Sequence, residues 1–535
     1  MPITADDLKF FASTKLTDDD DAGGPRTATV VQDGLTNNLW PDFSEPDRLA
    51  GRAQVRKLYP SVVDAGSDAL LGARLTINDP PANAATSVTL FGYGNDATLR
   101  KAFVDAVKAG VALLPVSVQN VTPFNSAFSA SAAYELGTDV LTVFNVTGST
   151  VQIAVGDTLA VTVAGVTQLH KAISASVVSG ATEWTLEPPL PTGSGTVSCA
   201  VRRIDFPGPR PYAAVATAAL AAAAATTIDL STLWVRVAPV NPALAYPTAE
   251  LATGIGSGWA QYTHGQMQCV QPGDLATISH EAAMTPATLA ALDVVDTLRT
   301  DLAQLTVVGN DGSVIARFVR NGVVPSGVGC TADLAAGTLT VSDVTGWSQP
   351  VTVRHRIAET VAVQSLTGLT ATLVAGLGRE YPSGAQFTTE VPLGDLQPGV
   401  GAAFHQQAWT KVWSDAVIGV AVAALYTGAI DVTTGGTEND RWAVVFTSST
   451  QFNLISERRG QIAAGNTATD FIPLNPDTGE PFFTLYAAGW VSPGLGNVMR
   501  FNTTGAYAAT WGIRSRYPDA SAGGDAALLR LRGDV

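Results

Sequence analysis

The chain has 535 residues, of which 46% are hydrophobic and 14% are charged, and its formal net charge is −15. This length predicts about three or four domains, and the apolar content excludes general disorder. The excess of acidic residues argues against a nucleic-acid partner, because phosphate binding needs a basic face. The three cysteines, Cys199, Cys269 and Cys330, lie far apart and form no C-x-x-C pair, so neither a disulfide framework nor a zinc site is indicated.

The amino-terminal stretch MPITADDLKFFAS lacks the basic and apolar regions of a signal peptide. Further along, the least polar run, from Ala213 to Thr227, is too short and too weakly apolar to span a bilayer. We therefore expect a protein that is made in the cytoplasm and does not insert into a membrane.

Four consecutive aspartates lie close to the amino terminus, in the stretch LTDDDDAGGPRT (16–27). A calcium loop of the EF-hand type that starts at Asp18 would place Thr29 at its twelfth position, where a bidentate Glu is required; this motif is excluded, and only a looser calcium site stays open. Mutual repulsion beside the Gly-Gly-Pro turn favours a solvated, flexible arm, to be ordered by a basic neighbour. The candidate subunit-interface residues here are Asp18, Asp19, Asp20 and Asp21.

The polar, proline-broken stretch NNLWPDFSEPDR carries two aromatic side chains. Aromatic residues in such loops either fold back onto their own domain or anchor into a partner. Three arginines in and just after this stretch pair either with the carboxylates just upstream or with an acidic neighbouring subunit. The candidate interface residues of this segment are Trp40, Phe43, Arg48, Arg52 and Arg56.

One helix is clearly indicated, in the stretch DATLRKAFVDAVKAGVALLP. Apolar residues recur at steps of three or four positions from Leu99 to Leu114, Asp96 is placed to cap the amino terminus, and Pro115 ends the pattern. The Ala-rich run near Ala213 is either a second helix or a low-complexity linker.

An internal repeat organises the middle of the chain. The phrase LTVFNVTG (141–148) returns as LTVSDVTG (339–346). After each copy comes a Val-rich stretch with one histidine, His170 or His355, and then a strand that holds a Thr-Leu pair. Two similar β modules of about 60 residues each are therefore expected. In such modules the histidines have a repeated structural role rather than a catalytic or metal-binding one.

Most of the remaining chain has the pattern of β-strands. The stretch LTVVGNDGSVIARFV (305–319) places Asp311-Gly312 between β-branched runs, which is a strong hairpin signal. The expected fold class is mainly β and multi-domain, with small β-sandwich or barrel modules, the internal repeat, and a minor α-helical segment in an α+β amino-terminal region. The expected segments are an N-terminal arm and assembly segment (1–60), an α+β domain (61–135) with its helix near 96–114, β repeat 1 (136–205), a linker and β region (206–330), β repeat 2 (331–395) and a C-terminal β-rich domain (396–535).

No enzyme signature passes a test of its spacing. The chain has neither a G-x-x-x-x-G-K-[ST] phosphate loop nor a G-x-S-x-G nucleophile motif. The stretch SHEAAM begins like a zinc-protease helix but has Met284 where the second histidine must be. Nothing marks any two carboxylates as an acid/base pair. We therefore expect no enzyme, no catalytic residues, no cofactor and no bound metal.

Long phrases at both ends of the chain resemble a known family. They are RWAVVFTSSTQFNLISERRGQIAAGNTATDFIPLNPDTGEPFFTLYAAGW and GNVMRFNTTGAYAATWGIRSR near the carboxyl end, and DDDDAGGPRTATVVQDGLTNNLWPDFSEPDR followed by GRAQVRKLYPSV near the amino end. They are similar to structural proteins encoded among the tail and baseplate genes of contractile-tailed bacteriophages and related prophages. The resemblance implies a virion component of the tail or baseplate, in several symmetry-related copies, with no enzymatic residues.

The leading hypothesis is thus a structural tail or baseplate subunit, assembled in the host cytoplasm and located in the virion. Its partners would be other tail proteins and copies of itself in a three-fold or six-fold ring. The low content of charged residues, 14%, supports an assembly subunit. Ordinary soluble proteins carry about 25% charged residues, and a chain this poor in them can hide much of its surface against neighbouring subunits. A receptor- or glycan-binding tail module is the alternative, and a polysaccharide-degrading enzyme ranks last.

Overall fold

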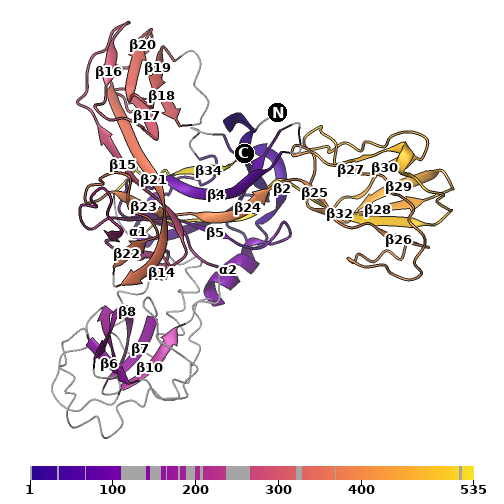
Figure 1. Ribbon diagram of the computed structural model, residues 1–535, viewed down its shortest axis with the longest axis horizontal. Coiled ribbons are helices and arrows are strands. Elements are labelled where there is room, and N and C mark those ends of the chain that lie inside the picture. The colour runs from indigo at the N-terminus through magenta and orange to yellow at the C-terminus, as the bar shows by residue number, and fades with distance from the viewer. Residues whose placement is uncertain are drawn as a thin grey trace.

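The computed structural model describes residues 3–32, 35, 37–64, 66, 68–109, 140–144, 158–163, 166–178, 181–187, 199–204, 209–236, 266–320, 328–367, 369–516 and 521–534. Within these residues the protein is mainly β with few helices and several separate sheets, which confirms the predicted fold class. Figure 1 shows a central body from which lobes project in different directions.

The central body is built by both ends of the chain. One antiparallel sheet has five strands in the order β2-β1-β3-β33-β5, and a second has three in the order β24-β4-β34. The strands of the first sheet are β1 (Leu8–Lys15), β2 (Gly23–Val30), β3 (Arg52–Val62), β5 (Thr86–Gly92) and β33 (Thr510–Arg516). Those of the second are β4 (Leu70–Asp79), β24 (Val391–Leu396) and β34 (Leu528–Asp534). Leu75 and Ile77 of β4 pack against Val88 and Leu90 of β5, so the two sheets share a core.

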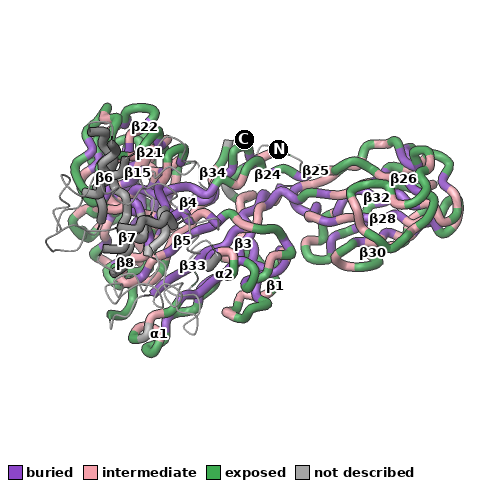
Figure 2. Tube along the Cα trace, turned by 90° about the horizontal axis from the view of Figure 1, so that it is seen from below, coloured by how far each residue is buried: buried purple, intermediate pink, exposed green. Residues whose placement is uncertain are grey.

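The amino-terminal 60 residues, expected as an arm, supply β1, β2 and β3 to the five-stranded sheet. The strand β5, from the expected α+β segment 61–135, lies in the same sheet because β33 stands between β3 and β5. With neighbours on both edges, β3 is buried along its length after its first residue, as Figure 2 shows. The two expected amino-terminal segments are therefore one body.

Two short helices lie beside these sheets. Helix α1 (Glu45–Ala50) begins at a capping box in which Ser44 and Asp47 bond reciprocally, and its chain leaves at Gly51, where φ is 79°. Helix α2 (Arg100–Ala109) begins four residues after Asp96, which does not cap it, and residues 110–114 of the expected helix lie outside the described residues. A 3-10 turn, η1 (Ala5–Asp7), precedes β1.

The first repeat copy forms a sheet of its own, in the order β10-β7-β8-β9-β6. Its strands are β6 (Val140–Phe144), β7 (Thr158–Val163), β8 (Val166–Val178), β9 (Ala181–Glu187) and β10 (Cys199–Ile204). Figure 1 shows these strands apart from the central body.

A middle lobe is organised around an eight-stranded sheet, and a three-stranded sheet β16-β20-β19 forms its tip. The long strand β21 runs through the larger sheet and pairs with β15, β17 and β22. The strands of the lobe are β11 (Ala214–Ala216), β12 (Thr227–Asp229), β13 (Trp234–Arg236), β14 (Gln266–Gln268), β15 (Leu275–Ala283), β16 (Val294–Asp296), β17 (Gln304–Val308), β18 (Val314–Val319), β19 (Cys330–Asp333), β20 (Thr338–Val341), β21 (Thr352–Thr367), β22 (Thr370–Leu373) and β23 (Gln386–Thr389).

The Ala-rich run in this lobe is neither a helix nor a linker. It contains β11, turns, and the start of β12, and both strands pair with distant strands, β23 and β22. Ala213 and Val215 are buried. Burial on a sheet thus outweighs the helix preference of alanine. The hairpin expected at 305–319 is present, with β17 and β18 joined through Gly312, where φ is 82°.

The two repeat copies share only part of their pairing. In each, a long strand with one histidine, β8 or β21, forms a hairpin with the Thr-Leu strand, β9 or β22. The preceding phrase differs: β6 pairs with β9, whereas β20 pairs with β16 and β19 in the tip. The second copy is therefore built into the larger lobe rather than closed on itself.

A carboxyl-terminal lobe has its own six-stranded sheet and its own aromatic core. Its elements are β25 (Gly399–Val400), β26 (Phe404–Gln406), β27 (Ile430–Asp431), β28 (Asp440–Phe446), β29 (Gln451–Ser456), β30 (Gly460–Asn466), β31 (Thr484–Leu485), η3 (Ala487–Gly489) and β32 (Val498–Thr504). The expected domain 396–535 therefore ends near β32, because β33 and β34 return to the central body.

Candidate functional site

The four aspartates form the turn between β1 and β2 and therefore belong to the central body. The Asp18 carboxylate lies 2.8 Å from the Arg52 guanidinium and also contacts Arg56, whose side chain is only 3% exposed. Burial opposes ionisation of Asp18, but the bonds from Arg56 and Arg52 outweigh it, and the pKa of Asp18 is lowered. The basic partner expected from a neighbouring subunit is thus supplied by the same chain.

The other three aspartates lie at the surface. Lys15 reaches Asp19 at 2.8 Å and Asp21 at 2.6 Å, while Arg100 lies 3.7 Å from Asp20. Their side chains are 63%, 68% and 78% exposed, in the order Asp19, Asp21, Asp20. Such exposed pairs contribute little to stability. These three carboxylates keep the interface prediction open, and the flexible arm is replaced by an ordered turn.

Trp40 and Phe43 fold back onto their own domain, the first of the two alternatives. Both rings are buried, and the Arg514 guanidinium lies 6.0 Å from the Trp40 ring centre and 4.5 Å from that of Phe43. Arg48 donates to the Phe43 carbonyl at 2.9 Å, and Arg52 pairs with Asp47 at 3.0 Å. In this conformation neither ring is free to enter a partner, and the arginines are paired locally.

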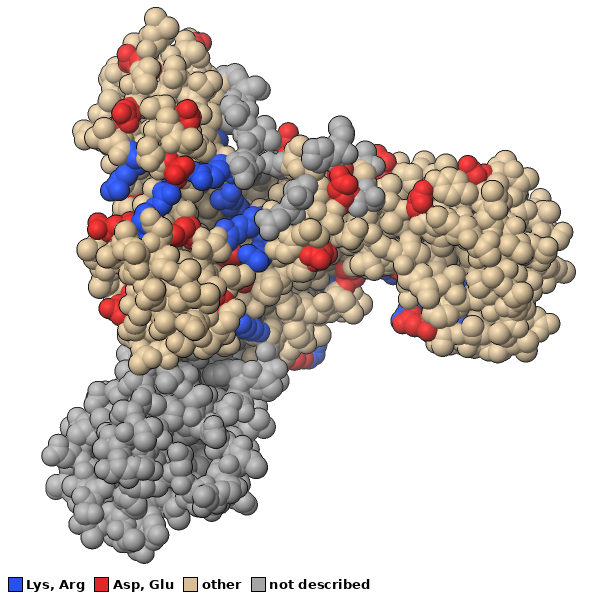
Figure 3. Space-filling model, in the orientation of Figure 1, with Lys and Arg blue, Asp and Glu red and all other residues tan. Residues whose placement is uncertain are grey.

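An arginine-lined cleft, absent from the sequence-based predictions, lies between the central body and the middle lobe. In Figure 3 the basic side chains gather in a band where the lobe that carries β16–β20 joins the rest. The cleft, with a cavity volume of about 150 Å³, has one wall on β4 and β34 and the other on β15, β21 and β23. Its polar lining residues include Thr76, Asn78, Thr277, Ser279, Arg320, Thr360, Gln386, Thr388, Arg530 and Arg532.

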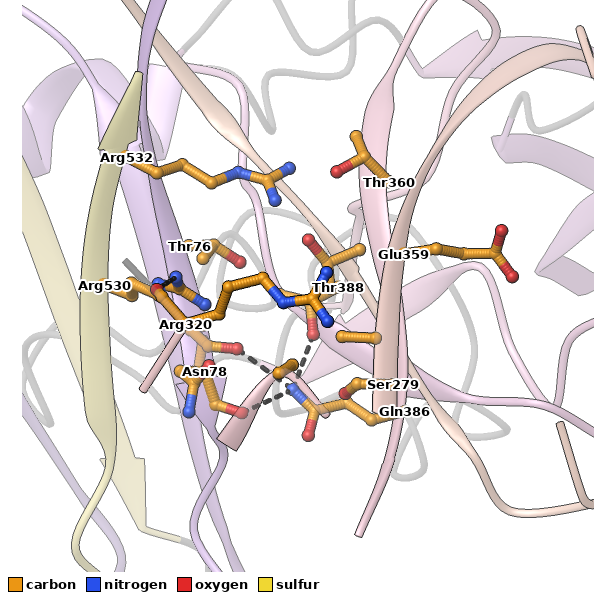
Figure 4. A pocket seen from close by; sticks show the side chains of 14 residues that line it. Thr76, Asn78, Ser279, Arg320, Glu359, Thr360, Gln386, Thr388, Arg530 and Arg532 are labelled. Atoms are coloured by element: carbon orange, nitrogen blue, oxygen red, sulfur yellow. Dashed lines mark hydrogen bonds between the residues drawn. The ribbon is translucent and has the colours of Figure 1, made fainter. Parts of the chain in front are cut away.

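Strand alternation explains the first wall. The sequence of β34 reads LLRLRGD, so Arg530 and Arg532 point to one face while Leu529 and Leu531 point to the other, where they pack in the core of the body. Figure 4 shows the guanidinium groups of Arg320 and Arg532 in the space between the walls. This Leu-Arg alternation was visible in the sequence, but its partner strand was not.

The second wall supplies hydroxyl and amide groups. Gln386 crosses the cleft and donates to the carbonyls of Ile77 (3.0 Å) and Asn78 (3.2 Å), which ties the lobe to the body. The Glu359 carboxylate points away from the arginines in Figure 4 and accepts a bond from the Gly378 amide at 2.7 Å. The cleft therefore presents arginines on one side and, apart from the Glu359 carboxylate that is turned away, neutral polar groups on the other, an arrangement suited to an oxyanion.

A larger polar cavity, of about 1110 Å³, lies where the carboxyl-terminal lobe meets the body. Asp96 accepts a hydrogen bond from the Tyr507 hydroxyl at 2.9 Å and lies 3.4 Å from Arg458, which is also 3.4 Å from Glu438. Burial raises the pKa values of Asp96 and Asp440. Because partners in the same chain hold these carboxylates, we interpret the cavity as a polar seam between lobe and body.

In the described part of the chain, no group of three or more His, Cys, Asp or Glu side chains gathers in a way that could hold a metal ion. None of the helices described has the length and apolar character that a membrane crossing requires. His355, one of the two repeat histidines, is buried, and burial lowers its pKa.

Comparison with known proteins gives few matches. No family model and no curated protein matches the chain. Among solved structures, it is similar to a chain in the atomic structure of Sulfolobus turreted icosahedral virus (7% identity, TM-score 0.10, 46% of this chain and 84% of that one) and to the crystal structure of the major capsid protein of that virus (8%, 0.10, 46% and 87%). A third is a structure of infectious bursal disease virus, Gx strain (11%, 0.08, 91% and 83%). Overlap this low carries no argument about fold or function.

Proposed function

We propose that the protein is a structural component of a virus particle, and specifically of the tail or baseplate of a contractile-tailed bacteriophage. The proposal rests on the pairing of two strands, β3 and β33, that lie in the stretches resembling the phage family. The amino-terminal phrase GRAQVRKLYPSV contains β3, the carboxyl-terminal phrase ending in WGIRSR contains β33, and the two strands pair from Arg52 opposite Arg516 to Leu58 opposite Thr510. The stretches that resemble the phage family thus build one sheet.

The exposed tip of the middle lobe fits a role in assembly. Leu292 and Leu298, which flank β16, are 87% and 85% exposed. Both have positive φ, 77° and 55°, a conformation that costs a leucine about 1–2 kcal/mol. Exposed apolar side chains in strained backbone are typical of binding elements. In the proposal the tip docks onto a neighbouring subunit of the particle, and the protein acts through such contacts rather than as an enzyme.

The direct test is to identify the chain in purified particles by mass spectrometry and to place it by cryo-electron microscopy. A variant with Leu292→Ser and Leu298→Ser should fold normally and be incorporated several-fold less well. Leu220→Ser, which removes a leucine that is 59% exposed elsewhere in the same lobe, serves as the control. Absence of the chain from intact particles would overturn the proposal.

The arginine-lined cleft favours a second candidate, a tail module that binds a receptor or glycan. Structural and binding roles are compatible in one virion protein, because the cleft and the lobe tip are different surfaces.

A further inference from the structure

The wall of the cleft formed by β4 and β34 carries more positive charge than its surroundings neutralise. Arg532 lies directly opposite Arg74 across the two strands, and Arg530 lies opposite Thr76. Like charges placed directly opposite destabilise a sheet. In a chain of net charge −15, such a wall calls for a reason beyond packing.

Most of the nearby arginines have a carboxylate partner. Arg532 pairs with Glu390, whose side chain is fully buried, and Arg320 lies 3.2 Å from Asp301. The neighbouring Arg356 pairs with Asp79 and with Glu281. These contacts account for three of the cations as structural elements.

Arg530 and Arg74 are different. Neither forms a salt bridge with any residue that the structure describes, and Arg530 donates only to the Arg320 carbonyl, at 3.2 Å. Burial, and then the adjacent Arg532 guanidinium, lower the pKa of Arg530, and the nearby Glu390 carboxylate, which is paired with Arg532, only partly offsets them. A negative group in the cleft would supply what the chain itself does not.

A second, independent feature points into the same space. Thr76 is 4% exposed, and its hydroxyl has no hydrogen-bond partner although it is directed into the cleft (Figure 4). A buried hydroxyl without a partner costs about 1–3 kcal/mol, and a water molecule or a polar group of a ligand in the cleft would supply the missing hydrogen bond. Thr360 and Ser279 on the opposite wall add further hydroxyls.

The shape and lining limit the class of ligand. The enclosed part of the cleft, about 150 Å³, has room for one small acidic group and part of the ring that carries it, and the cleft continues into open solvent. No aromatic side chain lines the cleft within the described residues, so a nucleobase would find no ring on which to stack. The hydroxyl and amide groups instead match the hydroxyls of a sugar.

We propose that this cleft binds a single acidic sugar unit, with its oxyanion held by Arg530 and its neighbours and its hydroxyls held by Thr76 and the threonines and serine of the facing wall. The oxyanion is a carboxylate or a phosphate, which arginine recognises by the same paired hydrogen bonds. This inference does not depend on the virion role, because it concerns the purified chain.

The test is calorimetric titration of the full chain with glucuronate, glucose 6-phosphate, glucose and inorganic phosphate. We expect glucuronate, glucose 6-phosphate or both to bind, and to bind more tightly than inorganic phosphate, while glucose does not bind. Binding of glucuronate alone identifies a carboxylate source, and binding of glucose 6-phosphate alone identifies a phosphate source.

Arg530→Gln should weaken acidic-sugar binding at least tenfold. Lys411→Gln removes one positive charge from the distant carboxyl-terminal lobe and should leave affinity unchanged. Thr76→Val keeps the shape of the side chain and should weaken binding several-fold with no loss of thermal stability, a result that a purely structural cleft would not give.

Three results would overturn the inference: no binding of either acidic sugar, acidic-sugar binding that both cleft variants leave intact, or inorganic phosphate that binds as tightly as the sugars. None of them bears on whether the chain is found in virus particles, so failure of this inference is distinguishable from failure of the proposed function.

Discussion

At the residue scale, the aspartate run divides into one buried contact and three surface charges. Asp18 faces an arginine that is almost fully buried, whereas Asp19, Asp20 and Asp21 point outward. The sequence shows four equal carboxylates, because nothing in a run of identical residues tells which one the fold turns inward. That difference leads to a prediction for single variants.

Asp18→Asn should destabilise the protein by about 2 kcal/mol, because a hydrogen bond to a charged group contributes about 1.5–3 kcal/mol and the Arg56 guanidinium would lose its carboxylate. Asp21→Asn is the matched control and should leave the denaturation midpoint unchanged. Urea denaturation of both variants measures the effect, and equal stability of the two would show that the Asp18 contact is unimportant.

The effect of Asp18 should also depend on pH in a defined direction. Its folded-state pKa lies below the ordinary value of 3.8, so its contribution is fully present above pH 3.8 and is lost as the pH falls through the lower, folded-state value. The stability gap between the natural protein and Asp18→Asn should therefore close below that pH. A gap that instead grows in acid would contradict the assigned direction.

At the scale of elements, we expect β33 to decide whether the central body forms. It lies between β3 and β5, and its Trp511 side chain stacks on Phe103 of α2 with ring centres 4.7 Å apart. By contrast, β34 is an edge strand, and β4 is its only partner among the strands that the structure describes. The two carboxyl-terminal strands should therefore have very different effects when they are removed.

A chain that ends at residue 516 keeps β33 and should fold with a lower melting temperature. A chain that ends at residue 505 loses β33 as well, which splits the five-stranded sheet, so its central body should lack a cooperative thermal transition and be digested rapidly by trypsin. Differential scanning calorimetry and limited proteolysis distinguish the two. Equal protease resistance of both truncations would show that β33 is dispensable.

Sequence patterns predicted the type of each element and the pairing of adjacent strands more reliably than the pairing of strands that lie far apart in the chain. The Asp311-Gly312 turn specifies its hairpin locally, and Phe103 and Val107 lie on the buried face of α2 as their spacing predicts. The Ala-rich run failed as a helix because its fate depends on β22 and β23, more than a hundred residues away in the chain. Such contacts leave no periodic signal.

At the scale of the molecule, the lobes differ in how they are attached. All of the buried residues in the aromatic core of the carboxyl-terminal lobe, including Trp442, Phe482 and Phe501, come from that lobe, and its junction with the body is polar. The core of the middle lobe is continuous with Phe103 and Trp511 of the body. The first should be an independent folding unit and the second should not.

The isolated fragment 399–505 should therefore unfold cooperatively on heating, with the near-ultraviolet circular dichroism of packed aromatic side chains. The fragment 209–389 is the matched comparison, and we expect it to expose hydrophobic surface and to lack a cooperative transition. Cooperative unfolding of both fragments would contradict the shared core of body and middle lobe.

The sequence by itself determined the β class, the hairpin, the main helix and the resemblance at the two ends of the chain, because each depends on residue types within a short window. Only the tertiary structure decided that the two ends pair as β3 and β33, that Trp40 and Phe43 turn inward, and that Arg530 and Thr76 become neighbours on one wall of a cleft. These features depend on which strands become neighbours. That choice is made by burial of whole surfaces and not by any local pattern.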